Sequence, residues 1–305
     1  IDSPTDGIFF AGACQGPKDI PASVAQGSAA AARASRILHS KTWQIEPTIA
    51  TVWPDRCVSA EGKACGICER SCPYGAIDYE RGKAAEVISA KCHGCGACVG
   101  ECPHDAITQL HYTDAQILSQ IRTLLAEEPH KKILALRCHW CSYGGADLAG
   151  TSHFEYTANE RGIKVMCSAR MDADFIYEAY RLGAGAILYS GCHPQDCHYI
   201  TGQVVGAKRA KRLESIFERL EMSPGRFRVE WISAAEGDKY ARVLNEMQAA
   251  LDAIPEADLL AEIERIRPDM AKRLSRLPNI PGVQKAMDHT EVLVNTILSK
   301  EGVKE

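Results

Sequence analysis

Eight cysteines between residues 57 and 102 fall into two sets of four, and their spacing constrains the fold of this chain more than any other feature. The second set has the spacing C-x2-C-x2-C-x3-C-P and consists of Cys92, Cys95, Cys98 and Cys102. Thiolates at this spacing turn inward around a cubane iron–sulphur cluster, and the fourth thiolate reaches across to a neighbouring cluster. The spacing therefore predicts two adjoining [4Fe-4S] clusters.

The first set repeats this pattern with one departure. It consists of Cys57, Cys65, Cys68 and Cys72, and its last three members recur in the second set at a constant offset of 30 residues. Gly62 stands where a standard run has its first cysteine. We expect Cys57 to replace it through a bulged loop over residues 58–64, because a surface insertion costs little closure entropy. The alternative is a free Cys57 thiol and a first cluster with three protein ligands.

The fourth cysteine of each set is predicted to bind the cluster of the other set. One cluster is then held by Cys57, Cys65, Cys68 and Cys102. The other cluster is held by Cys92, Cys95, Cys98 and Cys72. Bacterial ferredoxins share their ligands crosswise in this way, so the segment is predicted to be a ferredoxin-like domain.

Composition narrows the class of protein. Fourteen cysteines at metal-ligand spacings, without a signal peptide, favour reduced thiolates in a cytoplasm over a disulfide framework. A chain of 305 residues is long enough for two or three domains. A net charge of -4 gives no general attraction to nucleic acid, and no apolar run approaches the ~20 residues that span a bilayer. Because the chain begins at Ile1 with the end of a motif, we expect a processed or separated fragment.

From residue 131 onward, short apolar runs alternate with helix-compatible stretches, which indicates an open, mostly parallel α/β sheet. Strands are expected at 133–137, 163–166, 186–190 and 227–232. A cysteine follows each of the first three: Cys138, Cys167 and Cys192. Ligands bind at the carboxyl ends of parallel strands. We therefore expect these thiols to converge there, together with Cys141 and Cys197 on the adjoining loops.

Five candidate thiols for a four-ligand site leave one spare. We expect the spare to be Cys141 or Cys197, because each lies on a loop and not at a strand end. A structural zinc site would also accept four thiolates, although zinc ligands normally come as two knuckles on loops. A thioredoxin-like use of Cys138 and Cys141 would need the pair to be free of metal.

Three histidines lie beside these cysteines. A Rieske centre would need two of them as ligands, but the neighbouring cubane motifs favour ligation by cysteine alone. His139, His193 and His198 are then expected to surround the cluster without binding it. Arg170 and Lys164 are expected to supply charge near the cluster or to lie at the surface.

The remaining segments give weaker signals. A helix expected over 201–220 carries a run of Lys and Arg, which most simply is a solvated face; docking of an acidic redox partner is the alternative. Residues 255–305 place apolar side chains at helical spacing, with a break at Pro268 and a last helix around 283–298. This pattern predicts a helical tail that packs on a domain or a partner subunit, most simply as an assembly element; docking on a membrane surface is the alternative.

The N-terminal segment is expected to be a strand over residues 5–14, a turn rich in Gly and Pro, and an Ala/Ser-rich helix over 22–38. Its run from Ala11-Gly12 to Ser28 resembles the end of the flavin-binding domain in the A subunit of heterodisulfide reductase. The resemblance implies FAD shared with upstream or partner polypeptide, since the dinucleotide fingerprint is absent here. The implied flavin contacts are Gly12, Ala13, Cys14, Pro17, Asp19, Ile20, Pro21, Ser23 and Val24.

Residues 131–252 resemble the delta subunit of methyl-viologen-reducing hydrogenase. The resemblance rests on four blocks: Cys138-x2-Cys141-Ser142, Met166-Cys167-Ser168-x-Arg170, Cys192-His193-Pro194-x-Asp196-Cys197 and Glu230-Trp231-Ile232. It implies one [2Fe-2S] cluster on four of the five cysteines, held in a doubly wound fold. It also implies electron transfer between a hydrogenase or formate dehydrogenase and heterodisulfide reductase.

The sequence thus predicts an α/β and α+β multidomain protein with a ferredoxin-like 2[4Fe-4S] domain, an open, mostly parallel sheet domain and a helical C-terminal tail. The expected parts are 1–45 (end of a flavin domain), 46–112 (dicluster domain), 113–254 (delta-subunit-like domain) and 255–305 (assembly tail). The expected function is an electron-transfer subunit that relays electrons between a flavin and a partner redox enzyme, as in flavin-based bifurcation, with no complete substrate-converting site.

Two other functions stay open at this stage. The same architecture is similar to the B subunit of the quinone-interacting membrane-bound oxidoreductase, whose partner is a sulfur-metabolising enzyme and which reaches the membrane through another subunit. From a different class, a zinc-stabilised interaction module would use the same thiols without redox chemistry.

Overall fold

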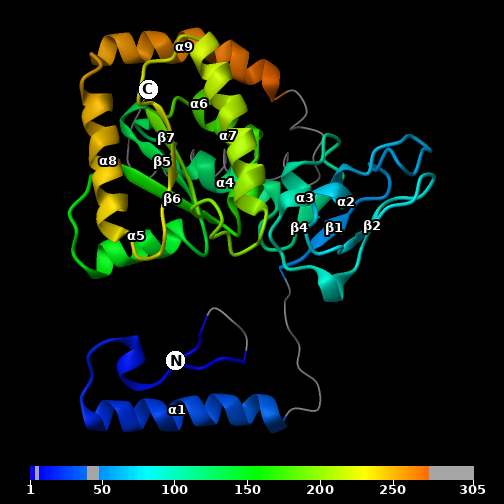
Figure 1. Cartoon of the computed structure of the whole chain (residues 1–305). Coiled ribbons are helices and arrows are strands. Elements are labelled where there is room, and N and C mark those ends of the chain that lie inside the picture. The colour runs from blue at the N-terminus through cyan, green and yellow to red at the C-terminus, as the bar shows by residue number, and fades with distance from the viewer. Residues whose placement is uncertain (4–6, 40–47, 275–305) are drawn as a thin grey trace, which may run out of the picture. The chain divides into compact units, whose positions relative to one another are not determined.

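The structure is a computed structural model that describes residues 1–3, 7–39 and 48–274. The chain divides into two compact units, Ile1–Pro47 and Thr48–Glu305 (Figure 1), and each is described by itself. Within the described residues, no helix has the length and apolar character needed to cross a membrane. The helix predicted over 283–298 lies outside the described residues.

The first unit is dominated by one helix, α1 (Ile20–His39). The Oδ1 atom of Asp19 accepts a hydrogen bond from the Ala22 N–H (2.7 Å), which caps the helix start. The predicted strand over 5–14 is wrong where the structure describes it. Phe9 forms a single bridge with Asp2, and Gly12–Gln15 is a 3-10 turn, η1. A regular strand needs a ladder of paired residues, and the described residues of this unit add only two backbone hydrogen bonds beside the bridge, from Ser3 to Ile8 and from Phe10 to Ile1.

Residues 48–112 form two antiparallel ribbons and two short helices. The ribbons pair β1 (Ala50–Val52) with β4 (Ile107–Gln109), and β2 (Ile77–Asp78) with β3 (Glu86–Val87). The helices are α2 (Ile67–Ser71) and α3 (Ala97–Gly100), with the 3-10 turn η2 (Ser89–Lys91) between them. Each helix follows a glycine in the left-handed region, Gly66 (φ 64°) or Gly96 (φ 76°), which L side chains rarely adopt. The repeat in the sequence is therefore also a repeat in the backbone.

The larger part of the second unit is a domain built around a four-stranded sheet. The strand order is β6-β5-β7-β8, and every neighbouring pair is parallel. Its strands are β5 (Ile133–Cys138), β6 (Glu160–Val165), β7 (Ala186–Gly191) and β8 (Phe227–Trp231). This confirms the predicted α/β domain with a parallel sheet. The chain passes from β6 back across β5 to β7, so the strand order reverses between β5 and β7. Open α/β sheets bind their ligands at such a switch point.

Helices cover both faces of the sheet (Figure 1). One core contains side chains of α5 (Ser142–Thr151) and α8 (Gly237–Asp252). The other core contains side chains of α4 (Asp114–Leu124), α6 (Ala173–Arg181) and α7 (Gly202–Arg219). Buried leucine and isoleucine side chains of β5 and β7 contribute to both cores. Short 3-10 turns, η3 (Pro129–Lys131) and η4 (Ser168–Arg170), precede β5 and follow β6.

The last described helix is α9 (Glu256–Arg273), which packs against α6. The predicted break at Pro268 is wrong, because α9 continues through this residue. A proline inside a helix removes one backbone hydrogen bond, but packing compensates here: Ile263, Ile266 and Met270 are all buried. The Arg226 guanidinium also pairs with Glu262 of α9 (2.6 Å).

Candidate metal centres

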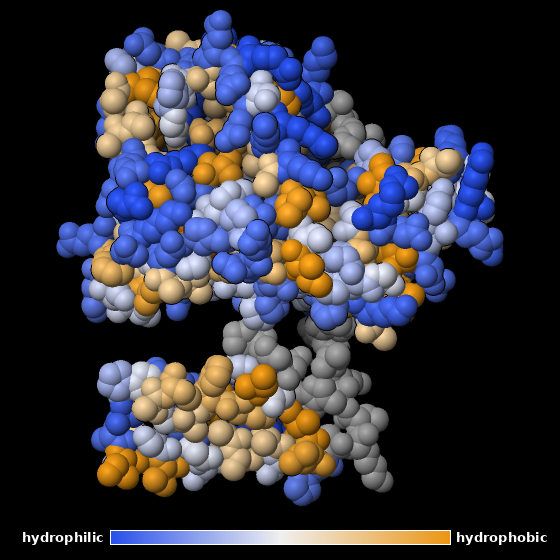
Figure 2. Space-filling view, in the orientation of Figure 1, coloured by the Kyte–Doolittle hydropathy of each residue, from blue (hydrophilic) through white to orange (hydrophobic). Residues whose placement is uncertain are grey.

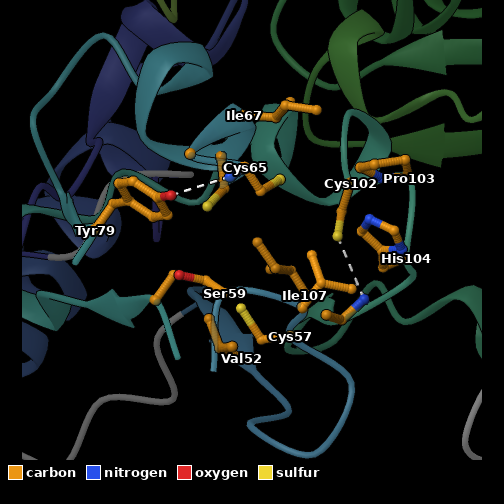
Figure 3. Close-up of a pocket in the computed structure, with 15 residues that line it drawn as sticks. Val52, Cys57, Ser59, Cys65, Ile67, Tyr79, Cys102, Pro103, His104 and Ile107 are labelled. Carbon is orange, nitrogen blue, oxygen red and sulfur yellow. Dashed lines mark hydrogen bonds between the residues drawn. The ribbon is translucent and has the colours of Figure 1, made fainter. Parts of the chain in front are cut away.

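The first cavity in residues 48–112 is lined by the four cysteines predicted for one cubane: Cys57, Cys65, Cys68 and Cys102. Its volume is about 380 Å³, counting the part that opens to solvent. Figure 3 shows Cys57, Cys65 and Cys102 reaching this space from three separate segments. Apolar side chains, among them Val52 and Ile107, form the rest of the wall. Four thiols that face one largely apolar space fit an iron–sulphur cluster.

The loop that follows Cys57 is an ordered series of turns. The Ala60 N–H donates to the Cys57 carbonyl (2.9 Å), and the Ser59 hydroxyl donates to the Glu80 carbonyl (3.1 Å). Ser59 is buried, although it lies in the segment predicted to bulge. Gly62 has φ 79°, so a glycine suits this turn where the standard motif has a cysteine. These contacts direct Cys57 into the wall of the first cavity.

The second cavity, of about 340 Å³, is lined by the other predicted set: Cys72, Cys92, Cys95 and Cys98. The Ala76 N–H donates to the Cys72 Sγ (3.4 Å), and the Ala106 N–H donates to the Cys102 Sγ in the first cavity at the same distance. Backbone donors of this kind stabilise charge on ligating sulphur. The two cavities are thus built alike. Each cavity is lined by three cysteines of one set and by the last cysteine of the other set, Cys102 in the first cavity and Cys72 in the second.

Burial makes these thiols poor acids by themselves. It raises the pKa of Cys68 and of Cys95 to about 11, because a buried thiolate loses its solvation. The pKa of Cys98 is raised well above its ordinary value for the same reason. A bound metal centre supplies the positive charge that allows such sulphurs to ionise.

A third group of thiols lies at the carboxyl edge of the parallel sheet. It consists of Cys138, Cys141, Cys167, Cys192 and Cys197, and is called the thiol group below. Cys138 ends β5 and Cys192 follows β7, and their Sγ atoms are 3.5 Å apart. These two thiols therefore meet where the strand order reverses, the position that sequence reasoning expected for the site.

Sulphur-to-sulphur hydrogen bonds connect the whole thiol group. Bonds to Cys141 and Cys192 hold the pKa of Cys138 well below its ordinary value. A bond to Cys167 lowers the pKa of Cys197 to about 2, and a bond to Cys138 raises the pKa of Cys141 to about 12. Cys138, Cys141 and Cys192 contact one another, Cys192 also contacts Cys197, and Cys197 contacts Cys167.

Space around the thiol group is limited. A Cβ atom at Gly202, the first residue of α7, would lie 2.2 Å from the Cys167 Sγ and 3.3 Å from the Cys197 Sγ. Only a glycine leaves room for both sulphurs at this helix start. The Gln203 N–H donates to the Cys197 Sγ (3.3 Å), so the first turn of α7 also orients this thiol.

The second cavity and the thiol group share one hydrophobic cluster. Cys95 and Cys167 both belong to it, with Tyr199 buried among them and Tyr74 packed against them. Burial and then the charges of Cys95 and Cys197 raise the pKa of Tyr74 to about 12. Another cluster contains Cys57, Cys68 and Cys102 of the first cavity together with Cys72, Cys92 and Cys98 of the second, so the second cavity adjoins both neighbours. Within this unit the three sites therefore follow one another: first cavity, second cavity, thiol group.

The histidines next to these cysteines have other partners. His198 stacks on Trp140 with ring centroids 3.7 Å apart, and the His193 Nε2 contacts the Glu236 carboxylate at 2.5 Å. Burial and nearby Lys164 lower the pKa of His139, which favours the neutral ring. The Lys164 ammonium lies over the ring of Tyr143. Within the described part of the chain, no group of three His, Cys, Asp or Glu side chains has its ligand atoms near enough to one another to hold a single metal ion.

Sequence reasoning missed the polar side chains that connect the dicluster segment to the sheet. Arg209 of α7 donates to the carbonyls of Ala169 (2.6 Å) and Gly100 (2.7 Å), and Gln109 donates to the carbonyl of Gly94. The charge run of this helix places Arg209 on a solvated face, but the residue is buried. The helical spacing of Arg209 relative to Gln203, Gly206 and Leu213, which are all buried on the same face of α7, could have indicated that Arg209 is buried.

The residues implied to contact a flavin lie in the first unit, around η1 and the start of α1. The Gly12 N–H donates to the Gln26 Oε1 (2.8 Å), and the Ser23 hydroxyl donates to the Asp19 carbonyl (2.8 Å). Cys14 is exposed. Figure 2 shows apolar side chains along α1, where Ile20 is 80% and Val24 64% exposed. The other implied contacts are Ala13, Pro17 and Pro21, and the flavin assignment stays a prediction.

Comparison with known proteins gives the family. The family described as methyl-viologen-reducing hydrogenase, delta subunit, matches residues 133–254. The D-type iron-sulfur subunit of the vhc F420-non-reducing hydrogenase of Methanococcus voltae is 38% identical over 130 residues, which are 43% of this chain and 90% of that relative. The chain belongs to the delta-subunit family of methyl-viologen-reducing hydrogenase. Its preceding part, residues 62–113, matches the LdpA Fe-S cluster-binding domain.

Longer relatives of this delta-subunit family member extend the similarity toward the N-terminus. The A subunit of the ferredoxin/F(420)H(2)-dependent CoB-CoM heterodisulfide reductase of Methanosarcina acetivorans is 42% identical over 255 residues, 83% of this chain and 31% of that relative. The second A-type iron-sulfur subunit of the Methanopyrus kandleri CoB–CoM heterodisulfide reductase is 54% identical over 78 residues, 26% of this chain and 11% of that relative. The chain thus spans about a third or less of these A-type relatives. The predicted resemblances to the A subunit of heterodisulfide reductase and to the hydrogenase delta subunit are confirmed, and the relatives' names describe oxidoreductase subunits, as expected.

Proposed function

We propose that this chain relays single electrons between a flavin and a partner redox enzyme in a heterodisulfide-reductase-like complex. The observation that carries the proposal is the succession of three sulphur-lined sites in one unit, with Cys95 and Cys167 in the same hydrophobic cluster. Two [4Fe-4S] clusters and one [2Fe-2S] cluster would supply the one-electron redox chemistry. The chain's own residues hold these centres close together and exclude water from the space between the last two.

The eight cysteines of the two cavities would ligate the cubanes crosswise. The N–H groups of Ala76 and Ala106, which donate to the Sγ atoms of Cys72 and Cys102, would stabilise the reduced centres. Apolar walls would keep solvent from the sulphurs and so help to set the potentials. This arrangement supports a ferredoxin-like fold for residues 46–112.

In the thiol group, we propose two pairs of ligands and a spare. Two thiolates on one tetrahedral metal lie about 3.8 Å apart when each metal–sulphur bond is about 2.3 Å. Cys138 and Cys192, at 3.5 Å, suit one iron, and the hydrogen-bonded pair Cys167 and Cys197 suits the other. Cys141 lies on the loop between β5 and α5, contacts both members of the Cys138–Cys192 pair, and is the spare.

The remaining parts would serve assembly. Residues 1–45 would complete a flavin domain whose nucleotide-binding portion lies in upstream or partner polypeptide, since α1 buries none of its residues within its own unit. Residues 275–305 would bind a neighbouring protein of the complex, because the apolar side chains of α9 are already buried within its own unit. In a cytoplasmic complex, the thiol-group centre would then exchange electrons with a hydrogenase, a formate dehydrogenase or a sulfur-metabolising enzyme.

An anaerobic reductive titration of the purified chain tests this function. We expect uptake of about three electrons per chain, one for each centre, and no flavin absorbance. A chain that takes up no electrons would exclude a relay. Stoichiometric bound FAD would instead show that the flavin domain is complete within these residues.

A further inference from the structure

The Arg170 side chain is fully buried, with 0% of its surface exposed. It belongs to η4, which follows Cys167 directly. Its Nη2 atom donates to the Tyr112 carbonyl (2.8 Å) and to the Asp114 carboxylate (2.7 Å). Its guanidinium carbon lies 5.0 Å from the centre of the Phe175 ring. A permanent positive charge is thus enclosed next to the thiol group.

The same side chain supports the second cavity from behind. A Cβ atom at Gly96 would lie 2.6 Å from the Arg170 Cδ and 2.5 Å from the Gln109 Oε1. Gly96 lines the second cavity, between Cys95 and Cys98. The backbone that carries these two cysteines therefore rests directly on Arg170 and Gln109.

Part of the guanidinium has no partner. Among the described residues, Arg170 Nε and Nη1 and the Gln109 Oε1 are buried polar atoms without a hydrogen bond. Buried charges are normally paired and fully bonded, because desolvation is costly. Asp114 neutralises one side of Arg170, and Arg209 and Glu101 form a further ion pair where the dicluster segment meets the sheet. The unpaired N–H groups leave residual positive potential between the second cavity and the thiol group.

We propose that Arg170 raises the reduction potential of the centre held by Cys72, Cys92, Cys95 and Cys98 above that of the centre in the first cavity. The inference rests on the proposed function. Reduction adds one electron to the cluster and breaks no bond, so the added negative charge interacts directly with nearby fixed charge, and weakly screened positive charge favours the reduced form. The second cavity then becomes the site at which an electron from the thiol group rests.

The test is an anaerobic redox titration followed by EPR on four variants of the full chain. Arg170→Met should lower the one-electron reduction equilibrium constant of one cubane about tenfold, or about 59 mV, and leave the other cubane within error. Asp114→Asn removes the counter-charge and should shift the same cubane in the opposite direction. Arg122→Met is the matched control, because Arg122 is buried, pairs with Glu178 (2.6 Å) and also has a buried Nη1 without a partner. Arg122 lies near the end of α4, at the edge of the sheet opposite the thiol group. The Leu124 carbonyl at this end of α4 accepts a hydrogen bond from Lys132, just before β5. Arg122→Met should therefore change neither cubane's reduction potential.

An unchanged potential in an iron-replete Arg170→Met protein would overturn the proposal, as would an equal shift of both cubanes. If Arg170→Met loads no iron, Asp114→Asn and Arg170→Lys decide the question. Asp114→Asn must raise the potential of one cubane, and Arg170→Lys, which keeps the charge, must stay nearer to wild type than any neutral variant. A wild-type protein without two cubane signals would contradict the proposed function, which separates that failure from failure of the Arg170 role.

Discussion

Replacing Cys57 by Ala should convert one of the two four-iron centres to a three-iron form or remove it, while the other centre keeps its signal. The reason is geometric, because Cys57 lines the first cavity with Cys65, Cys68 and Cys102, and the turns after it fix its position. Without this thiol, one corner of a cubane has no protein ligand. Iron analysis and EPR of the anaerobically purified variant measure the loss.

Cys14→Ala is the matched control for this experiment. Cys14 is exposed in the first unit and belongs to neither cavity, so its loss should leave the iron content and the EPR spectrum unchanged. A Cys57→Ala protein with wild-type iron and a wild-type reduced spectrum would show that Cys57 is a free thiol. The first cluster would then have three protein ligands.

Replacing Cys192 by Ser should abolish the two-iron signal and leave both cubane signals in place. Cys192 contacts Cys138 at 3.5 Å and also bonds to Cys197, so it connects the two proposed ligand pairs. Serine at Cys138 or Cys167 should have the same effect, because the sheet fixes these residues at strand ends. Reduced-protein EPR at low temperature separates the two-iron signal from the cubane signals.

Cys141→Ser is the internal control, since Cys141 lies on the loop between β5 and α5 and is the proposed spare thiol. This variant should retain most of the two-iron signal. Retention of the full signal in any strand-end variant would refute the proposed ligation. Loss of the two-iron signal in Cys141→Ser, together with its retention in Cys197→Ser, would show that Cys141 is the ligand and Cys197 is the spare.

Local spacing predicted the grouping of the eight dicluster cysteines because each loop folds on itself. The x2 and x3 steps and a glycine before each short helix bring sulphurs together without help from distant chain. The structure gathers Cys57 with Cys65, Cys68 and Cys102, as the crosswise pattern predicts. Binding of iron by these residues stays a prediction. The thiol group could also be placed, since the ends of parallel strands meet at one edge.

Features that depend on packing between distant segments could not be read in this way. Pro268 signals a helix end locally, yet buried neighbours in α9 carry the helix through it. Arg170 and Gln109 meet at Gly96 only because the dicluster segment docks on the sheet domain. Arg209 resembles the surface cations around it in the sequence, although its helical register placed it on the buried face of α7.

The most direct test of the central claim is elemental analysis of the anaerobically purified chain, combined with EPR of the dithionite-reduced protein. We expect about ten iron atoms per chain, from two four-iron centres and one two-iron centre, with signals from both cluster types. Zinc bound in place of iron, with an EPR-silent reduced protein, would contradict it and would make the chain a zinc-stabilised interaction module.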